Sequence, residues 1–228
     1  MRNQTIKMLV KTLKDNGLFY IPYLILLLAL IPVLILFNKP DIHLWINHFN
    51  SDFSDWLFRH ITFLGDGLFI IIPAVVLLFF SLRHFIFLVV SYFSTGLFAQ
   101  ILKRVFFDDV TRPSRYFHDK ASLHLVDGVE LLSGRSFPSG HATSAFALFL
   151  CFALISSNRY IKLACFILAC LVAFSRVYLS QHFLIDIYTG SMIGTLGATG
   201  FYLVFYHDER KWYAWTIQNL FRHDSSKA

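Results

Sequence analysis

Six long apolar runs are the feature that most restricts how this chain can fold. They occupy residues 18–37, 67–82, 85–102, 140–156, 160–177 and 185–206. Runs of roughly 18 apolar residues are long enough to cross a bilayer as helices. Only 15% of the residues are charged, against about 25% in an ordinary soluble domain. We therefore expect one integral membrane domain over residues 1–228, an all-α six-helix bundle.

Basic residues in the connections between these runs predict the orientation. An even number of spans places both termini on one side. The connections expected on that side carry Arg2, Lys7, Lys11, Lys14, Arg83, Arg159, Lys162, Arg210 and Lys211, and by the positive-inside rule this face is cytoplasmic. The basic start resembles a signal peptide, but no small-residue cleavage site follows the first run, so we expect a retained first helix.

The first outer connection, residues 38–66, is rich in aromatic and small polar residues. This composition suits a helical segment that lies in the headgroup layer between the first two spans. Its histidines, His43, His48 and His60, lack metal-ligand spacing, so we expect them to be solvated at the interface. The cysteines, Cys151, Cys165 and Cys170, all lie in apolar runs and are expected to serve packing.

The second outer connection, residues 103–137, breaks the charge rule. It carries Lys103, Arg104, Arg112, Arg115, Lys120 and Arg135. An anionic ligand on the outer side explains these charges, and a basic loop resting on anionic headgroups is the alternative. The formal net charge of +6 does not indicate a nucleic-acid partner, because the basic residues form no stripe or arm.

The fourth run opens with Pro138, Ser139, Gly140 and His141. A helix start offers unpaired backbone N–H groups and a partial positive charge, which suit a phosphate. Ser139 adds a hydroxyl donor, and His141 is able to give or take a proton near neutral pH. Serine and histidine are also common helix caps, so this pattern alone is weak evidence for a site.

A second cluster lies at the junction of the last two runs, with Ser175, Arg176, His182 and Asp186. Arginine offers a planar fork of donors for phosphate oxygens. His182 and Asp186 are four residues apart, so on a helix the carboxylate holds one ring nitrogen and leaves the other free to attack. The alternative is a polar helix N-terminus, but ionisable residues beside membrane segments are more often functional.

The predicted topology brings these clusters together. In a six-span chain the third helix ends, the fourth begins, the fifth ends and the sixth begins on the same side. Those four ends carry the region from Lys103 to Arg112, the Ser139 to His141 turn, Arg176, and the pair His182 and Asp186. An error of one helix between them would separate the clusters by roughly 30 Å of hydrocarbon.

In its motifs the chain resembles the type 2 phosphatidic acid phosphatase superfamily, which includes glucose-6-phosphatase-like enzymes and soluble vanadium haloperoxidases. The P-S-G-H motif is met by residues 138–141, and S-R-x5-H-x3-D is met by residues 175–186 without a gap. The K-x6-R-P motif is met only at Arg112 and Pro113, because Val105 stands at the lysine position. We expect Lys103 to fill that role, with Arg104 as the alternative. The motif-bearing core covers about 103–190.

The resemblance implies a division of roles. His182 would attack phosphorus and form a phosphohistidine while Asp186 orients its imidazole, and His141 would protonate the leaving oxygen. Lys103, Arg112 and Arg176 would hold the phosphoryl oxygens together with two further residues, Ser139 and Gly140. Phosphoryl transfer depends mainly on such positioning and electrostatics, so we expect neither metal nor cofactor. Clustered carboxylates for a two-metal site are also missing from the sequence.

Three polar residues outside the motifs could also border the site. Asp66 is expected to cap the second helix rather than border the site. Arg115 and Arg135 are candidates for a second phosphate or a lipid headgroup, and a solvated loop surface is the equal alternative.

We therefore expect a membrane enzyme, multi-pass in a bacterial inner membrane, that hydrolyses an amphiphilic phosphate ester or diphosphate on the outer, periplasmic face. The candidate substrates are undecaprenyl pyrophosphate, lipid A phosphate, phosphatidylglycerol phosphate and phosphatidic acid. The first two are slightly favoured. The expected partners are this substrate and membrane lipids, not nucleic acid, and the oligomeric state stays open. A transporter is disfavoured because the runs carry no mid-membrane charges. A vanadate haloperoxidase is disfavoured because that branch is soluble.

Overall fold

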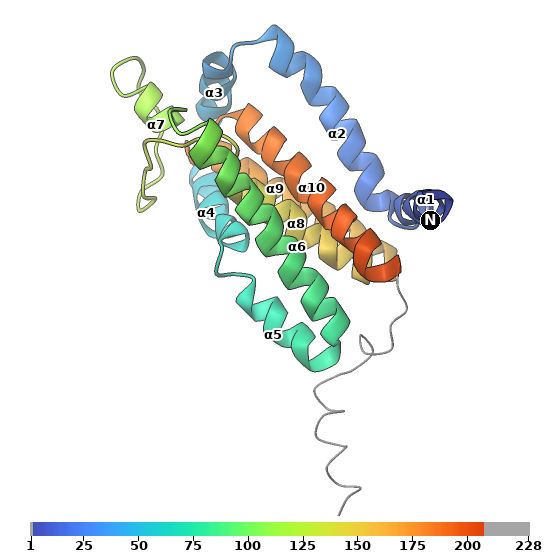
Figure 1. Ribbon diagram of the computed structural model, residues 1–228. Helices are drawn as coiled ribbons and strands as arrows, with labels where there is room; N and C mark the ends of the chain where they lie inside the picture. Colours follow the sequence, from blue (N-terminus) through green and yellow to red (C-terminus); the bar gives the residue numbers. More distant parts are fainter. Residues whose placement is uncertain (1, 208–228) are drawn as a thin grey trace, which may run out of the picture.

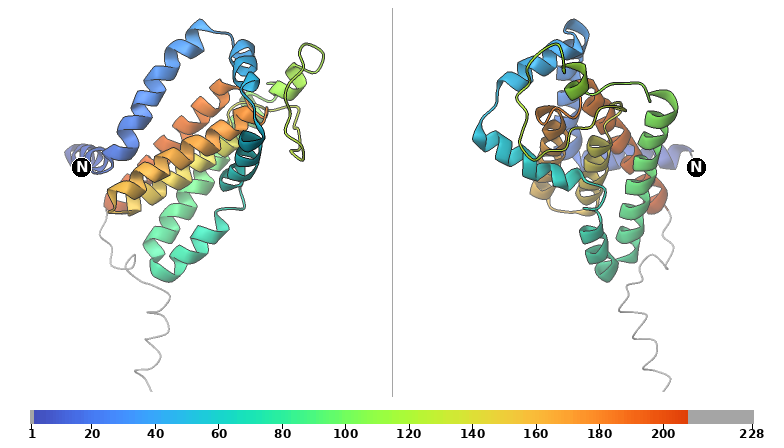
Figure 2. Two further views of the ribbon diagram at one scale, coloured as in Figure 1. Left: turned by 180° about the vertical axis from the view of Figure 1, so that it is seen from behind. Right: turned by 90° about the vertical axis from the view of Figure 1, so that its left-hand side faces the viewer.

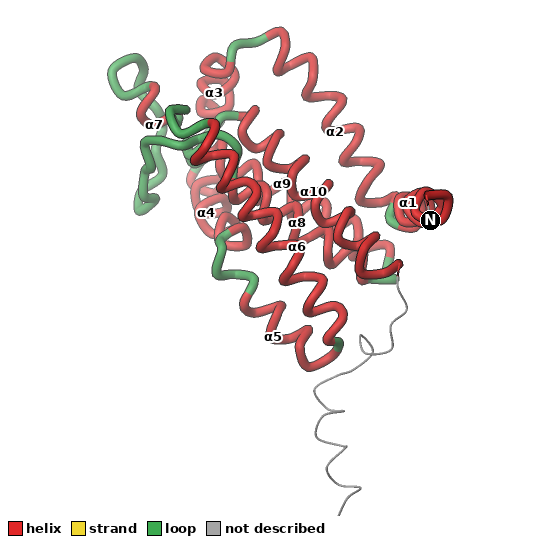
Figure 3. The backbone as a smooth tube through the Cα atoms, in the orientation of Figure 1, coloured by secondary structure: helices red, strands yellow, loops and turns green. Residues whose placement is uncertain are grey.

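The computed structural model describes residues 2–207, and over this range it is helical without strands (Figures 1 and 3). Arg210 and Lys211, expected in an inner connection, lie outside the described residues. The elements are α1 (Arg2–Asp15), α2 (Gly17–Leu36), α3 (Lys39–His48), α4 (Asp52–Ile61), η1 (Thr62–Gly65), α5 (Ile71–Phe80), α6 (Leu82–Ile101), η2 (Leu102–Phe106), α7 (Pro113–Tyr116), α8 (Gly140–Ile155), α9 (Arg159–Tyr178) and α10 (Leu184–His207).

Helix α8 forms the centre of the molecule. It packs against α6, α9 and α10, which surround it in all views (Figures 1 and 2). Most of its side chains are buried, from Ala142 to Leu154. A helix that is apolar on every face is expected to be enclosed by other helices, and α8 meets that expectation.

Small residues on α10 allow it to approach α8 closely. A Cβ atom built on Gly190 would lie 2.5 Å from the carbonyl oxygen of Ser139 and 3.1 Å from the Cβ of Ala142. One turn further along, a Cβ on Gly194 would collide with the backbone of α8. Small residues four apart are a common way to bring two membrane helices into backbone contact. Gly190 thus sets the spacing between the two motif-bearing helix starts.

Helix α2 stands partly apart from this bundle. Its upper half in Figure 1 diverges from α10, and an apolar groove of about 1110 Å³ lies between α2, α9 and α10. Leu27, Leu30, Phe174 and Ile187 are among the side chains that line this groove. At the other end of α2, the ammonium of Lys162 donates to the carbonyl of Asp15 at 2.8 Å and joins the start of α9 to the α1–α2 junction.

The helix boundaries agree with the six apolar runs to within about four residues, and the expectation of an all-α membrane fold is confirmed. Within residues 2–207, three segments are long and apolar enough to cross a bilayer individually: Gly17–Leu36, Leu82–Phe106 and Arg159–Tyr178. Helices α5 and α8 are shorter, because the turn from Asp66 delays α5 until Ile71 and α8 ends at Ile155. The count of six spans stays a prediction.

The segment 38–66 is helical, as expected. It forms α3, α4 and η1, and α4 begins with the hydroxyl of Ser51 accepting from the backbone N–H of Ser54 at 3.2 Å. Trp45 and Trp56 are exposed on these helices. The expectation of a solvated His43 is wrong, because its side chain is only 1% exposed and stacks on Phe117. Periodicity in so short a helix did not distinguish its buried face.

Candidate active site

The loops of the molecule gather mainly at one end of the bundle, where α6 ends, α8 begins, α9 ends and α10 begins (Figure 3). The clusters that the sequence singled out meet at this end. Contacts join them directly, because the guanidinium of Arg112 donates to the carbonyl of Gln181 at 3.0 Å. The backbone N–H of Ser139 donates to the carbonyl of Asp186 at 3.0 Å. The expected convergence of the three motifs is therefore present.

The imidazole of His182 lies at the centre of this end. The residue is located in the turn before α10 rather than on the helix, and its backbone N–H donates to the carbonyl of Arg176 at 3.0 Å. Asp186 lies in the first turn of α10, and its Oδ2 atom accepts from the backbone N–H of Phe183 at 3.0 Å. The carboxylate therefore caps the helix and faces the imidazole at the same time.

Neighbouring groups determine which nitrogen of His182 carries the proton. Its Nε2 atom lies 3.4 Å from Nη1 of Arg112, and a guanidinium has only hydrogens to offer. Nε2 must therefore present its lone pair. The proton is on Nδ1, which lies 3.3 Å from Oδ2 of Asp186. This arrangement leaves Nε2 as the nucleophilic atom.

The electrostatic surroundings keep this imidazole neutral. Burial lowers the pKa of His182 well below its ordinary value, and the positive charges of Arg112, Lys103 and Arg176 lower it further. A buried ring surrounded by cations is costly to protonate. The lone pair on Nε2 therefore stays available throughout the neutral pH range.

Three cationic side chains are buried around the imidazole. Lys103 is 6% exposed, while its neighbour Arg104 is exposed. The reason is the π-helical turn η2, which extends α6 and directs Lys103 inward. Arg176 donates through Nη1 to the hydroxyl of Thr62 at 2.7 Å, and its buried Nε has no hydrogen-bond partner within residues 2–207. Buried cations need a counter-charge, so the cluster favours an anionic ligand.

The start of α8 borders the same space. Ser139 is the N-cap of this helix, and its hydroxyl accepts from the backbone N–H of Ala142 at 3.3 Å. The hydroxyl retains a hydrogen to donate, and Gly140 provides a backbone N–H at the helix start. His141 lies within electrostatic reach of Arg176 and the other site cations.

Gly65 allows this first turn of α8 to lie against η1. A Cβ atom on Gly65 would come within 3.2 Å of the carbonyl oxygen of His141 and 2.6 Å of Cγ1 of Val172. The neighbouring carboxylate, that of Asp66, accepts from the backbone N–H of Leu68 at 3.1 Å in the turn before α5. Asp66 therefore closes the turn before α5, and the expectation that it caps the helix is wrong, because α5 begins at Ile71 with Ile70 as its N-cap.

Three residues with direct roles in this geometry were missed in the sequence. The hydroxyl of Ser136 donates to Oδ2 of Asp186, Thr62 contacts Arg176, and the side-chain oxygen of Gln181 accepts from Arg112 at 3.3 Å. Ser136 and Gln181 each stand close to a motif, and that proximity was the available signal. Thr62 comes from a different connection and carries no local signal.

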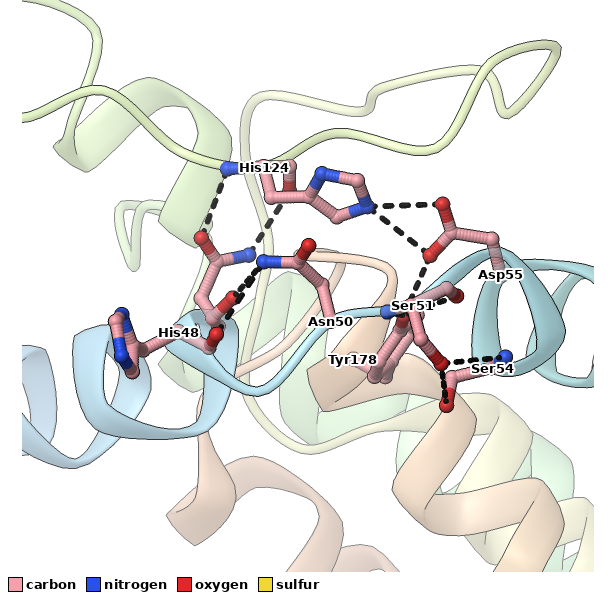
Figure 4. A network of polar contacts seen from close by, with 8 residues as sticks. His48, Asn50, Ser51, Ser54, Asp55, His124 and Tyr178 are labelled. Carbon is pink, nitrogen blue, oxygen red and sulfur yellow. Dashed lines mark hydrogen bonds and ion pairs between the residues drawn. The ribbon is translucent and has the colours of Figure 1, made fainter.

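A separate polar network holds the loop between α7 and α8 against α3 and α4 (Figure 4). Asn47 exchanges two hydrogen bonds with the backbone of His124, each of 2.8 Å. The ring of His124 lies 2.9 Å from the carboxylate of Asp55, which also accepts from the hydroxyl of Tyr178. The loop is thus fastened to the end of α9, two residues after Arg176.

No group of three or more His, Cys, Asp or Glu residues able to hold a metal ion occurs within the described residues 2–207. Cys151 and Cys165 are buried, and Cys170 is half-buried.

The fold and the site define a helical membrane protein with a buried cation cluster around an imidazole and carboxylate pair. Residues 84–210 match the family described as the PAP2 superfamily, and since this is more than half of the chain, the protein belongs to that superfamily. No curated protein sequence matches this chain.

Two solved structures share the fold. The first is Aquifex aeolicus LpxE, 25% identical, with a TM-score of 0.63 over 71% of this chain and 92% of that one. The second is a transmembrane PAP2 type phosphatidylglycerolphosphate phosphatase from Bacillus subtilis, 24% identical, with a TM-score of 0.59 over 87% and 98%. These findings support a membrane phosphatase of the PAP2 superfamily.

Proposed function

We propose that this protein hydrolyses a lipid phosphate or diphosphate through a phosphohistidine at His182, without a metal ion. The observation that carries the proposal is the state of His182: Nε2 presents its lone pair toward Arg112 in the cation cluster, while Nδ1 faces Asp186. An oriented, neutral imidazole in a cluster of cations has the properties of a nucleophile for phosphorus.

The proposed reaction has two steps. In the first, Nε2 of His182 attacks phosphorus, the bond from phosphorus to the leaving oxygen breaks, and His141 gives that oxygen a proton. In the second, His141 takes a proton from water, the water oxygen attacks phosphorus, and the N–P bond breaks to release phosphate and free His182. The charge on the phosphoryl oxygens is stabilised by three cations, Lys103, Arg112 and Arg176. The hydroxyl of Ser139 and the backbone N–H of Gly140 contribute as well.

A lipid substrate is supported by the location of the site. Lys103 and Arg176 lie at the ends of the apolar helical segments Leu82–Phe106 and Arg159–Tyr178. A phosphate headgroup is able to enter there while its hydrocarbon tail stays in the bilayer. Undecaprenyl pyrophosphate, lipid A phosphate, phosphatidylglycerol phosphate and phosphatidic acid remain the candidates, and one of the two similar structures is a phosphatidylglycerolphosphate phosphatase.

The test is phosphate release by the full chain purified in detergent. The four lipid phosphates are compared with a short-chain phosphate ester of the same headgroup. We expect a lipid to be preferred and His182→Ala to lower the rate at least about a thousandfold, because the nucleophile is lost. His48→Ala is the matched control, since His48 is exposed on α3. Equal rates for His182→Ala and the unchanged protein would refute the mechanism.

Two further arms test the remaining parts of the proposal. Incubation with a metal chelator should leave the rate unchanged, and loss of activity would contradict a metal-free mechanism. We also propose that the site faces the periplasm in a six-span topology. A cysteine introduced at the exposed Asp119 should react with an impermeant reagent in intact cells. Labelling only after permeabilisation would reverse the orientation.

A further inference from the structure

Ser136 lies at the imidazole and carboxylate pair without belonging to any motif. Its side chain is fully buried. The hydroxyl donates to Oδ2 of Asp186, and its oxygen lies 3.4 Å from Nδ1 of His182. One hydroxyl therefore contacts both members of the pair.

The backbone around Ser136 is held in place by the loop that also carries Arg112. The N–H of Ser136 donates to the carbonyl of Val110 at 2.9 Å, and the N–H of Arg112 donates to the carbonyl of Ser133 at 3.1 Å. Arg135, directly before Ser136, has a φ of 55°, a left-handed conformation that is uncommon for a non-glycine residue. These constraints place the hydroxyl between the two site residues.

The hydroxyl of Ser136 gives the His182 ring a second hydrogen-bond acceptor. The Nδ1 proton of His182 has two acceptors in range, Oδ2 of Asp186 at 3.3 Å and Oγ of Ser136 at 3.4 Å. Both contacts are long for N–H to oxygen bonds, so neither partner alone fixes the ring. Because the hydrogen of Ser136 is directed to Asp186, its oxygen lone pairs remain available to His182.

We propose that Ser136 is a positioning residue that, together with Asp186, holds His182 in the tautomer with the proton on Nδ1 and the lone pair on Nε2. The inference rests on the proposed function, in which Nε2 is the nucleophile. Ser136 contacts the Nδ1 side of the ring, whereas the proposed attack uses Nε2. Its removal therefore weakens the orientation of the nucleophile and leaves substrate binding intact.

The first experiment separates the hydroxyl from the space that it fills. Ser136→Ala should lower kcat about ten- to hundredfold, the range expected for one hydrogen bond to a charged group, and change KM less than about twofold. Ser136→Thr keeps the hydroxyl and should recover most of the rate. Ser114→Ala is the matched control, because Ser114 also anchors this loop by donating to the carbonyl of Leu132 at 3.0 Å, but is only half-buried and forms no hydrogen bond with His182 or Asp186 within residues 2–207.

Two kinetic outcomes would overturn the inference. One is a kcat for Ser136→Ala within twofold of the unchanged protein. The other is an equal loss in Ser136→Ala and Ser136→Thr while both remain folded by size-exclusion chromatography, since the hydroxyl would then be irrelevant.

A second measurement does not depend on turnover. Nitrogen-15 spectra of histidine-labelled protein report the tautomer of His182, whose signals are identified by their loss in His182→Gln. We expect a single tautomer protonated on Nδ1 in the unchanged protein and a mixture in Ser136→Ala. An unchanged tautomer in Ser136→Ala refutes the positioning role even if no lipid phosphate is hydrolysed, whereas a failure of hydrolysis alone refutes only the proposed function.

Discussion

Lys103 and Arg104 offer a pair of adjacent cations that differ in their access to the site. The sequence left both open for the first-motif role, but η2 buries Lys103 and leaves Arg104 exposed. Methionine replaces either side chain with an uncharged chain of similar length. We therefore expect Lys103→Met to inactivate the protein and Arg104→Met to be tolerated.

The expected magnitudes follow from burial. Removing one buried donor that stabilises a developing oxyanion costs about 2.7–4 kcal/mol, or about a hundred- to thousandfold in kcat. An exposed charge is screened by water and salt, so the loss for Arg104→Met should stay within about fivefold. The two variants should thus differ at least about twentyfold.

Thermal stability provides an independent test of the Lys103→Met and Arg104→Met variants. Lys103 lies among like charges, those of Arg112 and Arg176, so Lys103→Met removes repulsion as well as the cost of burying an ammonium. Its melting temperature without phosphate should equal or exceed that of the unchanged protein. Phosphate release and thermal unfolding in detergent measure both effects. A larger kcat loss in Arg104→Met, or equal losses in both, would show that the assignment of Lys103 is wrong.

Two further changes test the packing and the pH response. Gly190→Ala should lower the melting temperature and kcat together, because its Cβ would push against Ser139 at a cost of about 1–3 kcal/mol, whereas Gly200→Ala has open space and should be neutral in both assays. Burial lowers the pKa of His43 to about 4, so the unfolded chain binds the extra proton first as pH falls below about 6.5. Stability should then decrease between about pH 6.5 and 4, by on the order of 3 kcal/mol, and His43→Gln should flatten this decrease in thermal unfolding measured at pH 7 and 5.

Most helix boundaries could be predicted because the length of an apolar run is a local property of the chain. Two features depended on tertiary structure instead. Helix α10 contains Gly190 and Gly194, which dilute its apolar character but allow contact with α8. Helix α5 starts late because Asp66 closes a turn. Neither effect is visible in the hydrophobicity of a single segment.

The site was predictable where one helix end or one fixed spacing determined the geometry. A fixed spacing predicted the pair His182 and Asp186, and a helix start predicted the N-cap Ser139. Thr62 and Ser136 do not, because each reaches the site through a contact between segments distant in the sequence. Lys103 is an intermediate case, because the motif spacing fails at Val105. The packing of the π-helical turn η2, which buries Lys103 and leaves Arg104 exposed, distinguishes the two cations.

Charge balance connects the buried cations of the site to the proposed chemistry. Lys103, Arg112 and Arg176 bring three buried positive charges to one end of the bundle, and Asp186 brings a single negative charge there. His182 adds none while its imidazole is neutral. The difference of two positive charges equals the charge of a phosphate monoester above its second pKa of about 6. Under the proposed function, a phosphoryl group would complete this cluster, which would explain why three cations are buried at one end of the apolar helices.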